Sequence, residues 1–273
     1  MISIRKAIIP VAGLGTRFLP ITKAIPKEML PILDAPIAHY IVKEALHANI
    51  NEIIFITNHN KPSIQKYFDQ NPDFDKVTFT YVNQFEQLGL GHAVSCAEDF
   101  VCDEPFLVML GDLIFFPQSD FLASMINKYK QHKKNIIAVH KVKDYEISRY
   151  GVVNGPENNN MTLWNIHSMA EKPDPSNAPG PWAIPGRYIL EPRVFHHLRQ
   201  IKSGTGGEYQ LTDALSLLSN EGALMAFHLQ EQVFDTGDKV QYLMANIEFA
   251  LRRTDLEEEL LLKLRRKLNT LKT

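Results

Sequence analysis

The alternation of apolar runs and helical segments constrains the fold of this 273-residue chain more than any other feature. Strands are expected at 4–11, 53–57, 77–82 and 106–110, and helices at 35–49, 62–69 and 92–100. Apolar runs without polar alternation are typical of parallel strands that are covered on both faces. The pattern therefore predicts an α/β fold of the Rossmann-like, doubly wound kind, with a mostly parallel mixed sheet flanked by helices. In such sheets ligands bind beyond the carboxyl ends of the strands.

The second half of the chain has a less regular pattern. Strands are expected at 136–140, 150–153, 161–171 and 182–190, and helices at 118–133, 192–201 and 209–220. The segment 173–181 is rich in Pro, Asn and Gly, which predicts a loop and makes it a candidate lid over a site.

Charge and composition exclude several classes of partner. The chain has 29 Lys and Arg against 31 Asp and Glu, a formal charge of −2, so we expect no nucleic-acid partner and no membrane partner. No apolar run approaches the roughly 20 residues of a membrane span. Cys96 and Cys102 form no Cys-x-x-Cys pair, which argues against a zinc or redox site. We expect buried free thiols in a reducing compartment and a cytoplasmic protein.

The first expected strand leads directly into a loop that contains Gly13 and Gly15. Two glycines let the backbone turn tightly and bring N–H groups close to a ligand. Arg17 and Lys27 add positive charge to the same region, an arrangement suited to a polyphosphate. Phe18 stands where the dinucleotide-binding fingerprint needs a third glycine, and no Gly-Lys-Ser/Thr triplet follows. Both of those phosphate-binding motifs are therefore excluded.

The longer pattern around this loop is more specific than its glycine pair. Residues 12–20 read Ala-Gly-Leu-Gly-Thr-Arg-Phe-Leu-Pro, and residues 22–31 read Thr-Lys-Ala-Ile-Pro-Lys-Glu-Met-Leu-Pro. This sequence closely resembles the sugar-nucleotide pyrophosphorylases, in particular the bacterial UTP–glucose-1-phosphate uridylyltransferases, and matching motifs extend from residue 6 to residue 237. The resemblance implies Mg²⁺-dependent transfer in which UTP and glucose 1-phosphate give UDP-glucose and pyrophosphate. It also implies a nucleotidyltransferase domain at 1–253, with a nucleotide half at about 1–112 and a sugar half at about 113–237.

Two carboxylates are candidates for holding Mg²⁺. Asp112 follows the strand at 106–110, where an acidic residue by itself would be an ordinary turn residue. The resemblance makes Asp112 both a metal ligand and a substrate contact, and it matches a second ligand to Asp235 in the sequence Phe-Asp-Thr-Gly. Mg²⁺ is commonly held by one or two carboxylates together with substrate phosphates, so two are sufficient.

The resemblance also assigns the catalytic cations. Arg17 and Lys27 would stabilise the leaving pyrophosphate, Lys172 would bind the phosphate of the sugar, and Glu171 would accept from the glucose hydroxyls. By residue type alone, Glu171 and Lys172 form a solvated surface pair, although a carboxylate suits hydroxyl donors and a lysine suits phosphate. The attacking phosphate is already an anion near neutral pH, so the reaction needs no general base. The sequence contains no Ser-His-Asp or Cys-His set that would indicate nucleophilic catalysis.

The remaining candidates bind the base and the sugar. The resemblance pairs Gln84 with uracil, since an amide both donates and accepts; alternatively, Gln84 is an exposed residue at the end of a strand. It adds the backbone of Ala12, Gly13 and Gly91 around the base, Gly151, Gly186 and Glu208 around the sugar, and Glu28 as a further substrate contact. For Glu208, an acidic residue in the first turn of a helix is an almost equally good interpretation.

Other functions remain as alternatives. The connection between Phe68 and Val77 is short, as it is in thymidylyltransferases of the same fold, so synthesis of dTDP-glucose from dTTP is the nearest rival. A non-catalytic sugar-nucleotide-binding protein is a second alternative. The chain keeps five charged residues together that argue against it: Arg17, Lys27, Asp112, Lys172 and Asp235. A dehydrogenase is a third, which Phe18 disfavours.

The C-terminal segment 254–273 has the pattern of an amphipathic helix. Acidic residues precede basic ones, an order that complements the helix dipole, and leucines recur at helical spacing (Leu256, Leu260, Leu264, Leu268 and Leu271). Such a helix packs either on its own domain or on another subunit. We predict a subunit contact, and hence a homodimer or homotetramer.

Overall fold

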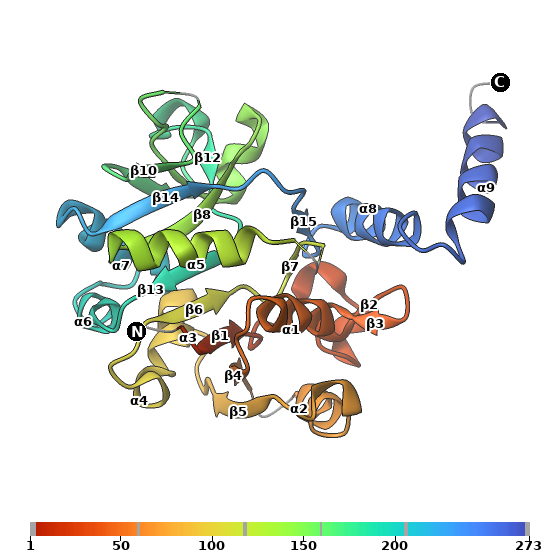
Figure 1. Ribbon diagram of the computed structural model, residues 1–273, viewed down its shortest axis with the longest axis horizontal. Helices are drawn as coiled ribbons and strands as arrows, with labels where there is room; N and C mark the ends of the chain where they lie inside the picture. The colour runs from red at the N-terminus through yellow and green to blue at the C-terminus, as the bar shows by residue number, and fades with distance from the viewer. Residues whose placement is uncertain (1–3, 59–60, 117–118, 159, 205–206, 271–273) are drawn as a thin grey trace.

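The computed structural model describes all residues except 1–3, 59–60, 117–118, 159, 205–206 and 271–273. Its centre is a mixed eleven-stranded sheet, in which β11-β9-β12-β8-β13-β6-β1-β4-β5 are neighbours in that order and β14 pairs with β8 and β10 (Figure 1). The strands are β1 (Lys6–Pro10), β4 (Glu52–Thr57), β5 (Thr78–Asn83), β6 (Phe106–Met109), β8 (Asn135–Lys141), β9 (Gly151–Val153), β10 (Leu163–Asn165), β11 (Met169–Glu171), β12 (Trp182–Ala183), β13 (Arg187–Leu190) and β14 (Leu224–His228).

Parallel pairing holds the first half of the chain together. Strands β6, β1, β4 and β5 pair in parallel, and β14 pairs in parallel with β8, whereas β13 runs antiparallel between β6 and β8. The predicted doubly wound α/β fold with a mixed sheet is therefore confirmed. Short two-stranded ribbons, β2 (Pro31–Ile32) with β3 (Ala35–Pro36) and β7 (Leu113–Ile114) with β15 (Phe234–Asp235), lie beside the main sheet.

Helices cover both faces of the sheet because alternate strand residues point in opposite directions. Ile9 and Phe55 belong to the core beneath α1 (Ile37–His47), α2 (Pro62–Asp69) and α5 (Phe121–His132). Ile8 and Ile54 belong to the opposite core, which is covered by α3 (Leu90–Ser95), α4 (Glu98–Val101), α6 (Arg193–Leu198) and α7 (Leu211–Asn220). Two buried cores explain why these strands read as unbroken apolar runs.

Several expected elements are divided or differently bounded. The helix expected at 92–100 is two helices, α3 and α4, and the strand expected at 182–190 is β12 and β13, separated at Gly186 (φ 71°). The helix expected from residue 35 begins at Ile37, after the β3 strand. The strand β14 and the helix α8 (Lys239–Ala250) are additional elements in a region to which the sequence pattern assigns none.

The C-terminal segment forms α9 (Glu257–Thr270), as expected. Figure 1 shows α9 directed away from the sheet, joined to it through α8, and none of its residues is buried. The chain's own domain therefore does not cover the leucine stripe of α9.

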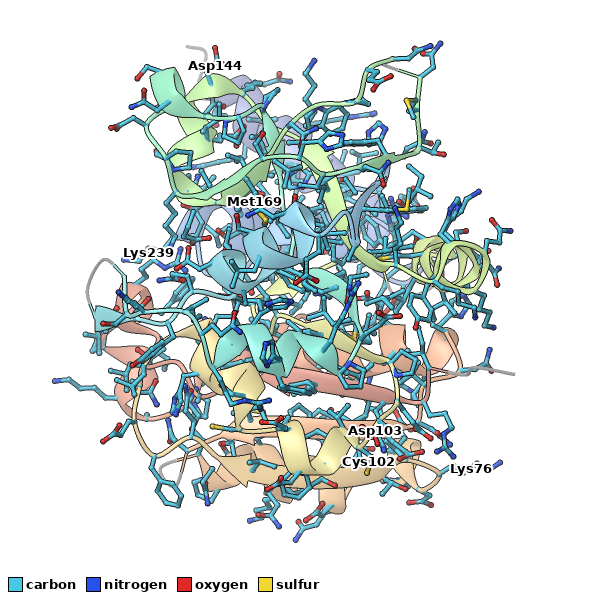
Figure 2. The ribbon with its side chains drawn as sticks, turned by 90° about the vertical axis from the view of Figure 1, so that its left-hand side faces the viewer. Lys76, Cys102, Asp103, Asp144, Met169 and Lys239 are labelled. Atoms are coloured by element: carbon cyan, nitrogen blue, oxygen red, sulfur yellow. The ribbon has the colours of Figure 1, made fainter. Side chains whose placement is uncertain are left out.

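The two cysteines are free, but the expectation that both are buried is wrong. Cys102 lies exposed on the turn after α4, next to Asp103 (Figure 2), and Cys96 is half-buried. Among the described residues, the structure has no helix with the length and apolar character needed to cross a bilayer.

Candidate active site

A cleft of about 800 Å³ opens at the carboxyl ends of the central strands. Twelve of the fourteen predicted site residues line it, from both halves of the chain: Ala12, Gly13, Arg17, Lys27, Glu28, Gln84, Asp112, Gly151, Glu171, Lys172, Glu208 and Asp235. Residues that lie far apart in the sequence thus meet at one edge of the sheet, as the topology of a doubly wound fold requires.

Gly91 and Gly186 are not among the lining residues. The N–H of Gly91 donates to the carbonyl of Tyr209 at 2.8 Å, and a Cβ at residue 91 would lie only 2.8 Å from that oxygen. Gly186 has a φ of 71°, and Leu110 fills the space that its Cβ would occupy. The structure thus gives both glycines a packing role, and it offers no support for the predicted contacts with base and sugar.

The glycine loop forms one wall of the cleft. Gly15 has a φ of 67°, a left-handed conformation that favours glycine, and its carbonyl accepts from the Thr22 hydroxyl at 2.9 Å. A Cβ at Gly15 would lie 3.0 Å from the Cγ2 atom of Thr22 and 3.2 Å from the Cβ atom of Lys27, closer than an ordinary contact. Gly15 therefore lets the backbone turn and leaves room for Thr22 and Lys27.

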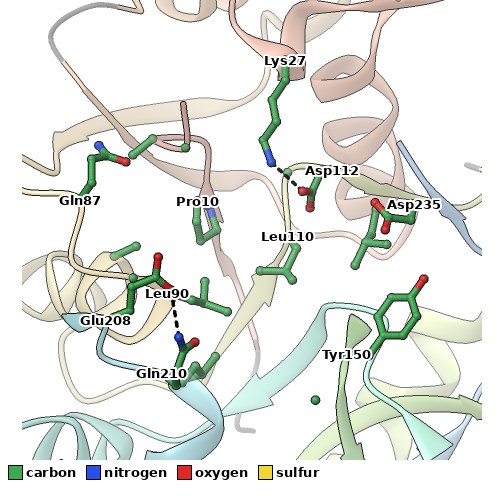
Figure 3. A pocket seen from close by; sticks show the side chains of 18 of the residues that line it. Pro10, Lys27, Gln87, Leu90, Leu110, Asp112, Tyr150, Glu208, Gln210 and Asp235 are labelled. Carbon is green, nitrogen blue, oxygen red and sulfur yellow. Dashed lines mark hydrogen bonds and ion pairs between the residues drawn. The ribbon is translucent and has the colours of Figure 1, made fainter. Parts of the chain in front are cut away.

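The two predicted metal carboxylates lie together on the floor of the cleft. The β15 strand pairs with β7, and Thr236 donates to the carbonyl of Asp112 through both its N–H (2.8 Å) and its hydroxyl (2.7 Å). This pairing places Asp235 beside Asp112, and the two are near each other in Figure 3.

Cationic side chains surround these carboxylates. The Lys27 ammonium donates to Asp112 at 2.6 Å (Figure 3), and the Arg17 guanidinium lies 4.0 Å from Asp112 and 3.9 Å from Asp235. Arg149 approaches the same carboxylate oxygen of Asp235, also to 3.9 Å. Arg17 and Lys27 are therefore placed where a polyphosphate beside the glycine loop would meet them.

Their electrostatic environments shift the pKa values of the two carboxyl groups in opposite directions. Burial alone would raise the pKa of Asp112, but the Lys27 ammonium, together with Arg17 and a backbone hydrogen bond, lowers it below the usual value. Burial and the negative charge of Asp112 both raise the pKa of Asp235, and Arg17 opposes them only in part. The two acids thus repel each other when both are ionised, a repulsion that a divalent cation between them would relieve.

This donor set fits Mg²⁺. Hard carboxylate oxygens on a cleft wall, beside cations that can hold phosphates, match the common arrangement in which Mg²⁺ is shared between protein and substrate. Among the described residues no cluster of three or more His, Cys, Asp or Glu side chains exists that could hold a metal by itself. A bound cation would therefore need oxygen ligands from the substrate or water.

The opposite wall carries the predicted sugar-side residues. Glu171, at the end of β11, accepts from the Thr212 hydroxyl at 2.6 Å. A Cβ at residue 151 would lie only 2.9 Å from the same carboxylate oxygen, so Gly151 leaves room for Glu171. Lys172 lies 3.5 Å from Glu171, with 57% of its side chain exposed, and has a φ of 43°. A cation and a carboxylate with open faces thus lie opposite the glycine loop.

Gln84 lies at the nucleotide end of the cleft and is buried, contrary to its interpretation as an exposed residue. Its amide nitrogen contacts the Gly89 carbonyl at 3.2 Å and the Nδ1 atom of His92 at 3.0 Å. These contacts fix the amide at the cleft wall, where it can recognise the edge of a base. Glu208 lies nearby and accepts from the Gln210 amide at 2.9 Å (Figure 3).

Sequence reasoning did not single out three further residues at or behind the cleft. Lys61 is buried behind the glycine loop and contacts Glu28 at 2.8 Å. Arg149 and Thr212 reach the site from a 3₁₀ helix (Asp144–Arg149) and from α7. A buried lysine in a polar segment after a strand has no local pattern that would reveal it, whereas Thr212 lies within the sequence Gly-Glu-Tyr-Gln-Leu-Thr-Asp at 207–213, which matches the family pattern.

Known proteins resemble this chain in both sequence and structure. The family model of nucleotidyl transferases matches residues 6–251. UTP–glucose-1-phosphate uridylyltransferase 1 of Staphylococcus saprophyticus is 40% identical over 94% of this chain and 96% of its own length. A crystal structure of UDP-glucose pyrophosphorylase complexed with UDP-glucose has a TM-score of 0.86 at 36% identity, covering 92% of this chain and 100% of that one. UTP-bound UGPase from Acinetobacter baumannii has the same TM-score of 0.86 at 34% identity, covering 96% of this chain and 99% of that one.

The match extends over nearly the full length of the sequence and over the fold. The chain therefore belongs to the nucleotidyl transferase family and, within it, to the UTP–glucose-1-phosphate uridylyltransferases.

Proposed function

We propose that this protein transfers a uridylyl group from UTP to glucose 1-phosphate, giving UDP-glucose and pyrophosphate. The observation that carries this proposal is the arrangement of Arg17, Lys27, Asp112 and Asp235 between the glycine loop and Lys172. A nucleoside triphosphate on the glycine loop and a sugar phosphate at Lys172 would meet at these charges. The printed names of the relatives support the same reaction.

The chemistry is an in-line displacement at the α-phosphorus of UTP. An oxygen of the sugar phosphate forms the new P–O bond, the bond to the β-phosphate breaks, and pyrophosphate leaves with the electron pair. Because the nucleophile is already anionic, no side chain needs to remove a proton. Lys172 orients the incoming phosphate, and Arg17 and Lys27 stabilise the charge on the leaving group.

Mg²⁺ belongs to this proposal as the cofactor, with Asp112 and Asp235 as the residues that would hold it. When bound, it would offset the charge of the phosphates. The contact of Lys27 with Asp112 keeps that carboxylate ionised, and therefore competent as a ligand, over the physiological range of pH.

An assay of pyrophosphate release tests the nucleotide and the reaction together. With glucose 1-phosphate and Mg²⁺, we expect release with UTP to exceed release with dTTP by about tenfold or more, the discrimination expected of one well-placed contact. A preference for dTTP would identify a thymidylyltransferase, and no release with either nucleotide would favour the non-catalytic binding protein.

We also infer that the protein is a homo-oligomer, a dimer or a tetramer. None of the residues Glu257–Thr270 is buried, and α8 exposes Val240, Leu243 and Met244 on the same arm. The cytoplasm is the proposed location, because a reaction on UTP and a sugar phosphate needs intracellular metabolites.

A further inference from the structure

Lys61 is a buried lysine that does not line the cleft. It lies between β4 and α2, directly before Pro62, and is 7% exposed. Its ammonium donates to the carbonyl of Val11 at 2.5 Å, to the carbonyl of Gly13 at 2.7 Å and to the Glu28 carboxylate at 2.8 Å. All three of its N–H donors are therefore directed at the glycine loop and its immediate support.

A neighbouring side chain continues this pattern. The Asn58 amide donates to the carbonyl of Ala12 at 2.8 Å, so three consecutive carbonyls, those of Val11, Ala12 and Gly13, accept from side chains that follow β4. Lys61 holds the first and the third of them. The backbone on both sides of Ala12 is thus drawn toward the residues that follow β4.

The geometry of the peptide bond gives this arrangement its consequence. In a planar trans peptide, the C=O of one residue and the N–H of the next point in opposite directions. When the carbonyls of Val11, Ala12 and Gly13 point toward Asn58 and Lys61, the N–H groups of Ala12, Gly13 and Leu14 point away from them. Ala12, Gly13 and Leu14 line the cleft.

A buried charge at this position would carry a large desolvation free energy if it had no partner. Burial lowers the pKa of Lys61 and so disfavours its ammonium form, and the Glu28 carboxylate, 1% exposed, opposes this effect in part. An apolar pair of similar volume would satisfy a merely structural core, but it could not bind the carbonyls of Val11 and Gly13 as Lys61 does. Lysine is suited to this use because one ammonium group binds two carbonyls and a carboxylate at once.

We propose that Lys61 is a positioning residue that orients the N–H groups of Ala12, Gly13 and Leu14 toward the nucleotide. The inference rests on the proposed function, since it takes UTP as the nucleotide. Lys61 acts through the loop, without touching the substrate. Its loss should therefore weaken binding of UTP and leave the sugar-phosphate wall, at Glu171 and Lys172, unaffected.

The experiment compares two variants that differ only at residue 61. Lys61→Met alone would leave Glu28 as an unpaired buried charge, so both proteins carry Glu28→Gln: one is Glu28→Gln, the other Lys61→Met/Glu28→Gln. UTP affinity is measured by isothermal titration calorimetry, and KM is measured separately for UTP and for glucose 1-phosphate. We expect the double variant to bind UTP about 10- to 100-fold more weakly than Glu28→Gln, as for loss of a charge-assisted hydrogen bond. KM for UTP should rise accordingly, and KM for glucose 1-phosphate should change by less than about threefold.

Lys6 provides a matched control. It is also a largely buried lysine that donates to a backbone carbonyl, that of Val101 at 3.1 Å, and contacts Glu104, but these partners lie in and after α4 and not in the glycine loop. Lys6→Met should lower the unfolding temperature without changing UTP affinity.

Equal UTP affinity in the two Glu28→Gln proteins would overturn the proposal for Lys61, and so would an equal rise in both KM values. A wild-type protein that neither binds UTP nor releases pyrophosphate would contradict the proposed function, and the inference with it. Normal wild-type binding and turnover together with an unaffected double variant would contradict the inference alone.

Discussion

Lys172 has a backbone conformation that is unusual for a lysine. Its φ of 43° lies in the left-handed region, which costs a non-glycine residue on the order of 1 kcal/mol. The conformation aims the chain at the end of β11 so that Glu171 and Lys172 both reach the cleft. Such strain at a cleft wall is consistent with a residue selected for binding.

Lys172→Ala should raise KM for glucose 1-phosphate by about tenfold or more, because the phosphate loses a charge-assisted contact. KM for UTP should change far less. Steady-state kinetics with each substrate varied in turn would measure both. Lys133 also has a left-handed conformation (φ 51°), at the end of α5 and outside the cleft, so Lys133→Ala is the matched control and should leave both KM values unchanged. An unaltered dependence on sugar phosphate in Lys172→Ala would remove Lys172 from the site.

Asp112→Asn should reduce Mg²⁺-dependent turnover by about 100-fold or more, since an amide binds a divalent cation poorly and no longer pairs with Lys27. Turnover and calorimetric titration with Mg²⁺ in the presence of UTP would measure the effect. Asp120→Asn is the control, because Asp120 has 86% of its side chain exposed at the start of α5. Normal activity of Asp112→Asn would show that the metal is bound elsewhere.

Asp235 links the site to the pH dependence of stability. Its pKa is raised in the folded protein by burial and by Asp112, so the folded state binds the proton more tightly than the unfolded state does. The ionised form therefore destabilises the fold once the pH exceeds the ordinary pKa of an aspartate, about 4. We expect Asp235→Asn to raise the unfolding temperature of the metal-free protein at pH 7, and the gain to fade as the pH falls toward 4. Calorimetric melting curves across this range would measure it, and a gain that persists at low pH would contradict this cause.

Arg187 connects three elements beneath the site. It is fully buried, forms a two-fold contact with Glu44 of α1 at 2.6 and 2.7 Å, and donates to the carbonyls of Leu110 and Leu113 on either side of Asp112. The guanidinium of Arg187, which lies on β13, thus holds the loop after β6 in place. Its fork of donors explains why an arginine serves here better than a lysine.

Arg187→Met should lower the free energy of unfolding by about 3–5 kcal/mol, because Glu44 would remain as an unpaired buried charge. Urea unfolding would measure the loss. The double variant Arg187→Met/Glu44→Leu should recover much of it, since an apolar pair needs no counter-charge. A double variant as unstable as the single one would show that the bonds to the loop carbonyls carry the stability.

The elements that the sequence predicted well are those with a local signal. Strands buried on both faces read as apolar runs, and motif residues directly after them, such as Asp112, reach the cleft because the topology ends those strands at one edge. The break between β12 and β13 was not predicted, because Gly186 turns the chain within an apolar run. Helix α8 was missed although Asp238 accepts from the N–H groups of Val240 and Gln241, a capping signal that is weak without periodicity.

Residues that act through tertiary contacts could not be predicted in this way. Lys61 and Arg187 lie in ordinary sequence surroundings, and only the folded chain shows that one holds the glycine loop and the other the Asp112 loop. The motif pattern also assigned Gly91 and Gly186 to substrate; those contacts stay predictions, and the structure shows in addition that both glycines pack closely, against Tyr209 and Leu110. A motif position can thus require glycine either for a substrate contact or for close packing, and sequence alone does not distinguish the two reasons.

We expect the arm formed by α8 and α9 to determine the oligomeric state of the protein. Removing residues after Arg253 should convert a homo-oligomer into a smaller species, because α9 extends away from the sheet and its own domain buries none of its residues. Analytical ultracentrifugation at micromolar concentration would measure the mass of both proteins. Arg265→Glu, on the helix but off the leucine positions, should perturb assembly less than Leu264→Asp. A monomeric full-length chain, unchanged by the truncation, would refute the subunit contact.

The ribbon formed by β7 and β15 has a consequence for the order in which the protein matures. It joins the loop after β6 to residues near the end of the domain, so the pairing that places Asp235 beside Asp112 cannot form until residue 235 has been synthesised. During synthesis the glycine loop and the central strands leave the ribosome long before residue 235 does. A chain that ends before residue 235 therefore lacks the partner strand of β7 and one of the two carboxylates proposed to hold Mg²⁺. The proposed cation site would be complete only once β15 has been made and has paired with β7.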